Sequence, residues 1–70
     1  MKLTDITGSE YISIYSSSFT DKVTDEVDFI KRESYDNRNK LLCIKIEQLR
    51  YDESSSEWVT TYYKPANKEG

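Results

Sequence analysis

The chain has 70 residues, of which 33% are charged, with a net charge of −3, no histidine, one cysteine and two glycines. Catalytic pairs that use histidine, Cys/His metal cages and glycine-lined phosphate loops all need residues that this sequence lacks. We therefore expect a protein that is not an enzyme, with no cofactor and no metal site.

Size and charge also restrict the fold and the partners. A chain this short forms one small domain, residues 1–70, with a limited core. A lone cysteine excludes an internal disulfide, so self-association is the remaining way to complete that core. The excess of acidic over basic residues argues against sequence-independent binding of nucleic acid. The sequence also shows no apolar run that fits a signal peptide or a membrane span. We expect a cytoplasmic protein with no membrane contact.

The N-terminal part begins with a weak pattern and continues with a strand pattern. Residues 1–8 carry few apolar side chains, and we expect them to be loosely ordered, as we do residues 65–70. In residues 10–19, Ile12 and Ile14 alternate with tyrosine and serine. Such alternation is typical of a half-buried strand, which we predict here.

Residues 20–36 fit two structures. Val23, Val27 and Ile30 lie on one stripe at helical spacing, with acidic residues early in the segment and basic residues late, an order that the helix dipole favours. A strand through Val27 and Phe29 that ends in a turn at residues 35–39 also fits, since Asn and Asp tolerate left-handed geometry. We favour the helix and keep the strand as the alternative.

The clearest pattern is a hairpin over residues 40–64. Two runs rich in β-branched and aromatic residues, 41–51 and 58–63, flank a polar connection at residues 52–57. This arrangement indicates two antiparallel strands. Pro65 cannot donate to a β-ladder and marks the end of the second strand.

These elements predict an α+β fold of order β-α-β-β, in which a small three-stranded antiparallel sheet carries one helix on one face. The alternative is an all-β meander, which applies if residues 20–36 are strands.

The register of the hairpin decides which side chains share a face. We place Tyr51 opposite Trp58, after which side chains alternate between the two faces. The face expected to pack under the helix holds Leu42, Ile44, Ile46, Val59 and Tyr63. The other face holds Leu49, Tyr51, Trp58 and Tyr62.

This second face is the candidate partner-binding surface. Large exposed aromatic side chains are typical anchors of protein interfaces, so we predict that Leu49, Tyr51, Trp58 and Tyr62 contact another protein or a second copy of the chain. A β-bulge between Ile46 and Leu49 would instead turn Trp58 and Tyr51 into the core. Both interpretations stay open.

Basic residues near the end of the predicted helix form a candidate anion contact: Lys31, Arg32, Arg38 and Lys40. The alternative is a solvated helix end whose bases satisfy terminal carbonyls. With neighbouring tyrosines these bases could bind single-stranded nucleic acid, but the net charge makes nucleic acid an unfavoured partner.

Two further features have a structural interpretation. Asp52, Glu53 and Glu57 surround the serine-rich loop, but their spacing matches no calcium loop, and we interpret them as a polar hairpin tip. Cys43 lies in an apolar run and has no histidine to act as its base, so we predict a small buried side chain.

The sequence therefore favours a small protein-binding or regulatory protein. The alternatives are a structural homodimer without independent activity and a single-stranded nucleic-acid-binding module. Residues with AT-rich codons far outnumber those with GC-rich codons. This bias indicates an AT-rich genome, such as that of a low-GC bacterium or its phage. Together with the small size and the missing catalytic residues, it fits an accessory protein of a phage, prophage or mobile element, an inhibitor that occupies a surface of a host protein.

Overall fold

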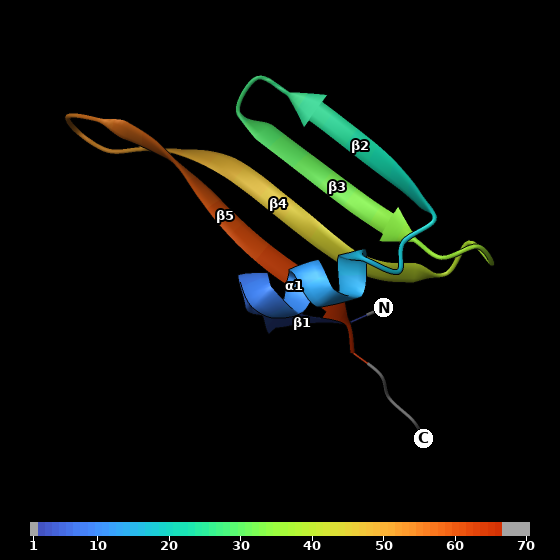
Figure 1. Cartoon of the computed structure of the whole chain (residues 1–70). Helices are drawn as coiled ribbons and strands as arrows, with labels where there is room; N and C mark the ends of the chain where they lie inside the picture. Colours follow the sequence, from blue (N-terminus) through green and yellow to red (C-terminus); the bar gives the residue numbers. More distant parts are fainter. Residues whose placement is uncertain (1, 67–70) are drawn as a thin grey trace.

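The computed structural model describes residues 2–66 and shows one antiparallel sheet with one short helix (Figure 1). In chain order the elements are β1 (Leu3–Ile6), α1 (Gly8–Tyr15), β2 (Thr20–Glu26), β3 (Phe29–Tyr35), β4 (Leu41–Tyr51) and β5 (Ser56–Pro65). The sheet order is β1-β5-β4-β3-β2, so β2 to β5 form a meander and β1 adds beside β5. The predicted three-stranded β-α-β-β fold is wrong, and the all-β alternative fits better.

The helix α1 forms where we predicted a strand. The Thr7 side chain accepts a hydrogen bond from Glu10 N at 3.1 Å and so satisfies an amide of the first turn. Tyr11 and Tyr15 are four residues apart and stack on one side of the helix, with ring centroids separated by 5.6 Å. Tyr11 is buried, whereas Ile12 is 67% exposed. The predicted strand is wrong because the spacing of the tyrosines, rather than the alternation of the isoleucines, decides which side chains meet the sheet.

Residues 20–36, predicted as a helix, instead form β2 and β3. The two strands pair along their whole length and turn at Val27 and Asp28, where Val27 is 92% exposed. On its other edge, β3 pairs with β4. The helix prediction is wrong because pairing on both edges of β3 outweighs the local stripe of apolar residues.

The turn after β3 lies where the strand alternative placed it, although Val27, through which that strand was drawn, lies in the turn between β2 and β3. Asp36 Oδ1 accepts hydrogen bonds from Arg38 N at 2.8 Å and Lys40 N at 2.9 Å. The hydrogen bond from the Lys40 amide is the largest cause of a lowered pKa at the Asp36 carboxyl, and the bond from the Arg38 amide is the second. Asn39 has a φ of 65°, a left-handed conformation that asparagine adopts more readily than most residues.

The C-terminal hairpin is confirmed, but with a different register. Leu49 pairs with Trp58, and Tyr51 pairs with Ser56, so the pairing is shifted by two residues from the predicted one. An even shift keeps each side chain on its predicted face. From Ile44 to Tyr51 the pairing of β4 with β5 contains no bulge.

The strand β1 lies in the N-terminal stretch that we expect to be loosely ordered. It pairs with β5, with Leu3 opposite Pro65 and Ile6 opposite Tyr62. Residue 1 and residues 67–70, to which the same expectation extends, lie outside the described residues.

The helix covers the face opposite to the one that we predicted. Ser34 and Cys43 pair across β3 and β4 and are sealed from solvent on the side where Tyr11 packs. Since neighbours in a strand point to opposite faces, Ile44 lies on the other side of the sheet. We call the side under α1 the helix face and the other side the open face.

The open face contains most of the residues that we predicted as core. At its centre are Phe29, Ile44, Ile46, Val59 and Tyr63, which share a side by register. Leu3, Leu42 and Pro65 lie on the same side at one end of the sheet. No helix or strand within residues 2–66 packs over them, because α1 contacts β4 and β5 from the helix face (Figure 1). The expected packing of a helix on this face is therefore wrong.

Candidate functional site

Three of the four predicted partner-binding residues lie together on the helix face, beyond the end of α1. Leu49 is opposite Trp58, and Tyr51 follows on the same side. The paired region of β3 ends opposite Gln48, so the hairpin continues past it as two strands (Figure 1). With no third strand beside them, Trp58 is 48% exposed and Tyr51 is 70% exposed. We call Leu49, Tyr51 and Trp58 the aromatic patch.

Tyr62 lies apart from the aromatic patch because α1 covers it. The ring centroids of Tyr11 and Tyr62 are 4.9 Å apart. At the start of the helix, a Cβ on Gly8 would lie 3.3 Å from Tyr62 Cε2, so glycine permits the close approach. On the same side, Lys64 Nζ donates to Glu10 Oε2 at 2.7 Å. Tyr62 therefore contributes to the packing of α1.

A polar cluster, which we call the Asp21 cluster, fixes the C-terminal end of α1 to β2 and β3. The Tyr15 hydroxyl donates to Asp21 Oδ2 at 2.9 Å, and Arg32 Nη1 donates to the same oxygen at 2.7 Å. Burial alone would raise the pKa of Asp21, but the hydrogen bonds from Tyr15 and Arg32 outweigh burial and lower it. The bond to Asp21 also raises the pKa of Tyr15. The carboxylate is therefore held charged in a structural role.

The Asp21 cluster was not predicted from the sequence. We had assigned the early acidic residues to the first turn of a helix and Arg32 to an anion contact. Once residues 20–36 are drawn as paired strands, Asp21 and Arg32 fall on the same face as diagonal neighbours, since Asp21 pairs with Ser34 and Arg32 pairs with Val23. The register of that hairpin is the signal that could have found the cluster.

The sealed polar groups under α1 carry no activated nucleophile. Cys43 is a free thiol, and burial raises its pKa, which keeps it protonated. Burial is likewise the main cause of the raised pKa of Tyr11. Ser34 Oγ makes no hydrogen bond, although polar groups of Tyr11 and Cys43 lie close to it. The prediction that Cys43 is a small buried side chain is confirmed.

The four basic residues of the candidate anion contact are dispersed. Lys31 lies on the open face and Arg32 on the helix face, and their nitrogen atoms are 3.8 Å and 2.7 Å from carboxylate oxygens. Arg38 and Lys40 lie in the turn after β3, where their backbone amides bind Asp36. The structure does not bring these four side chains together.

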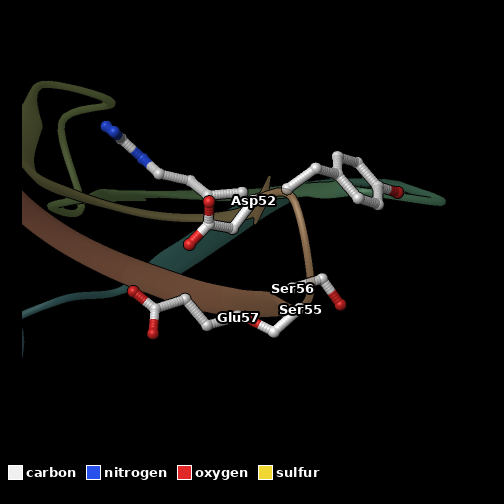
Figure 2. Close-up of a pocket in the computed structure, with 6 residues that line it drawn as sticks. Asp52, Ser55, Ser56 and Glu57 are labelled. Atoms are coloured by element: carbon white, nitrogen blue, oxygen red, sulfur yellow. The ribbon is translucent and has the colours of Figure 1, made fainter.

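The hairpin tip beside the aromatic patch is hollowed and polar. Its hollow of about 250 Å³ is lined by Arg50, Tyr51, Asp52, Ser55, Ser56 and Glu57. Figure 2 shows the carboxylates of Asp52 and Glu57 on the same side of the hairpin, with Ser55 at the turn. Asp52 N donates to Ser55 O at 2.7 Å and closes that turn. Across residues 2–66, no three Cys, Asp or Glu side chains are grouped as a metal site.

A second hollow, of about 170 Å³, lies on the open face. Its apolar lining consists of Phe29, Ile46, Val59 and Tyr63. Beside it, Ile44 is shielded by its neighbours and is 5% exposed. The sheet therefore presents an apolar surface on each side, the aromatic patch on one and the open face on the other.

Comparison of the chain with protein-family models, with curated proteins and with solved structures found no match. In the part of the chain that the structure describes, no helix is long and apolar enough to cross a membrane.

Proposed function

We propose that this chain is a protein-binding protein without catalysis of its own, and that the aromatic patch is its contact surface. The observation that carries the proposal is the exposure of Trp58 and Tyr51 at a two-stranded end of the sheet. An indole and a phenol offer a large apolar area at a small cost in side-chain entropy, and both can hydrogen-bond at the tip. A partner with an apolar pocket would remove this area from water.

The charges around the aromatic patch indicate the chemistry of the partner. Glu47 lies on the same face two residues before Leu49. At the hairpin tip beside the patch, two acidic side chains, Asp52 and Glu57, outnumber the one basic side chain, Arg50, although Glu57 and Arg50 belong to the open face. An acidic border favours a partner whose pocket is rimmed by Lys and Arg, and it repels nucleic acid. Association should therefore slow as ionic strength increases.

These surfaces fit a regulatory protein that acts by occupying a surface of its partner. The described residues offer a sealed thiol at Cys43 and a carboxylate at Asp21 that is already engaged, so the proposal includes no reaction. A cytoplasmic location and an origin in a phage or mobile element belong to the same proposal, and composition alone supports them.

Photo-crosslinking tests the aromatic patch directly. A benzophenone side chain at position 51 should crosslink to the partner in a lysate of the source cells, whereas the same group at Lys22, on β2, should not. With the purified partner, Trp58→Ala should weaken binding by about tenfold or more, as loss of an interface anchor does. Lys22→Ala is the control and should bind as the wild type does. Equal affinity of the wild type and Trp58→Ala, or crosslinking of that partner from position 22 and not from position 51, would refute the proposal.

A further inference from the structure

The open face is an apolar surface in the middle of a single-layered sheet. Its central apolar side chains occupy three adjacent strands, with Phe29 on β3, Ile44 and Ile46 on β4, and Val59 and Tyr63 on β5. A sheet with one apolar face normally buries it against a second layer. Here the helix α1 supplies a layer for the helix face only.

Within residues 2–66, no other segment covers this face. The loops between strands connect neighbours at the ends of the sheet (Figure 1). Residues 67–70 are Asn, Lys, Glu and Gly, which bring no apolar side chain. A second molecule can supply the layer that residues 2–66 do not.

The size of the open face suits a stable interface. Strands ~4.8 Å apart with ~3.3 Å per residue give a sheet whose five strands average about eight residues a face of about 24 Å by 26 Å, or about 600 Å². One partner in a standard protein interface contributes ~800 Å². A second copy of the chain presents the same area and the same apolar centre.

Charges on the open face favour a copy of the same chain over a strongly charged partner. Basic and acidic side chains are interspersed around the apolar centre: Lys22, Lys31 and Arg50 with Asp5, Glu26, Glu33 and Glu57. Lys31 Nζ is 3.8 Å from Glu33 Oε2. Because the two signs nearly balance, two such faces can meet without net repulsion.

The edges of the sheet are poor sites for association. β2 carries Asp21, Lys22, Asp25 and Glu26, and charged side chains protect an edge strand from pairing. β1 at the other edge has 4 residues. Association through the face is therefore favoured over the addition of strands at an edge.

We infer that the open face packs against the open face of a second copy of this chain, forming a two-fold sandwich of two five-stranded sheets. The hollow lined by Phe29, Ile46 and Val59 receives side chains of the facing copy. The aromatic patches stay exposed on the outer sides of this dimer. The inference uses a different surface from the proposed function, so each can fail without the other.

Sedimentation equilibrium from low micromolar to millimolar concentration tests this dimer. The wild type should sediment with twice the mass of one chain. Val59→Lys places a charge in the centre of the open face and should weaken dimerisation by more than about tenfold. The matched control is Thr60→Lys, because Thr60 is the next residue of β5, exposed and on the helix face. It should remain a dimer.

Circular dichroism shows whether each variant is folded. If Val59→Lys does not fold, Thr61→Lys on the same face is the milder variant, and it should dissociate the dimer in the same way. A monomeric wild type at all concentrations would overturn the inference. So would a dimer that a folded Val59→Lys or Thr61→Lys leaves intact, or one that Thr60→Lys or Trp58→Ala dissociates equally.

Discussion

The Asp21 cluster gives a prediction whose size and pH dependence follow from its geometry. Asp21→Asn keeps the shape of the side chain but removes the charge that Tyr15 and Arg32 bind at 2.9 Å and 2.7 Å. We expect the variant to fold with the same sheet and with α1 held less firmly. The change isolates the charge, because asparagine can still accept a hydrogen bond.

The expected loss is moderate because the cluster is partly exposed. A hydrogen bond to a charged group contributes about 1.5–3 kcal/mol when it is shielded, and an exposed ion pair contributes about 0–1 kcal/mol. Because the side chains of Arg32 and Asp21 are partly exposed, solvent screening places the contribution of this cluster to stability between those limits. Asp21→Asn should therefore lower the free energy of unfolding by about 1–2 kcal/mol, and lower Tm by about 4–15 °C in a domain of this size.

The pH dependence has a definite sign. The folded-state pKa of Asp21 lies below its ordinary value, so the ionised form stabilises the fold at every pH above that ordinary value. This contribution is lost as the pH falls below about 3.9 and through the lowered folded value. The difference in Tm between the wild type and Asp21→Asn, measured by circular dichroism at fixed protein concentration, should therefore shrink in acid. Comparing two proteins removes the parallel effect of Asp36, whose pKa is also lowered.

A matched control lies on the same strand. Asp25 shares the helix face with Asp21 and makes no side-chain hydrogen bond or ion pair within the described residues, so Asp25→Asn should leave Tm nearly unchanged. If Asp21→Asn has the Tm of the wild type at neutral pH, the cluster does not stabilise the fold. A loss that stays the same in acid would show that packing rather than charge is responsible.

Three further results are expected from side chains of contrasting exposure. The single tryptophan, Trp58, should emit at long wavelength and be quenched by acrylamide even when the protein is dimeric; a blue-shifted, protected emission would contradict its place in the aromatic patch. Cys43 should react with iodoacetamide only after unfolding, since it is sealed and its pKa is raised by burial; rapid labelling of the native protein would disprove this. Ile44→Ala should lower the free energy of unfolding, measured by chemical denaturation, by at least ~2 kcal/mol, whereas Ile12→Ala on the exposed side of α1 should change it by no more than ~0.5 kcal/mol. Similar losses in the two variants would contradict the burial of Ile44 and the exposure of Ile12.

The faces of the C-terminal hairpin could be predicted because they depend on alternation and not on the exact pairing. Tyr51 meets Ser56 instead of Trp58, yet both aromatic residues stay on the predicted side of the sheet. Three members of the candidate site, Leu49, Tyr51 and Trp58, therefore lie together as predicted. Whether they bind a partner stays a prediction.

The N-terminal half could not be predicted because its local patterns conflict with its tertiary environment. The segment that became α1 has isoleucines at strand spacing, while its tyrosines at helical spacing make the contacts with the sheet. The segment that became β2 and β3 has valines at helical spacing, but β3 has a hydrogen-bonded neighbour on each edge. These two exchanges also reversed the face that the helix covers. They placed Tyr62 under α1 and left the predicted core on the face that no helix covers.

The place of β1 in the sheet affects how the chain folds during synthesis. Each strand from β2 to β5 pairs with its neighbour in sequence, so these hairpins form early and locally. Leu3, near the start, pairs with Pro65, and this partner leaves the ribosome only after the four other strands have been made. Until then the first residues have no edge to join, and Tyr11 has no Tyr62 to pack against. Attachment of the N-terminal strand and the closing of the helix over the sheet are therefore the last steps of folding.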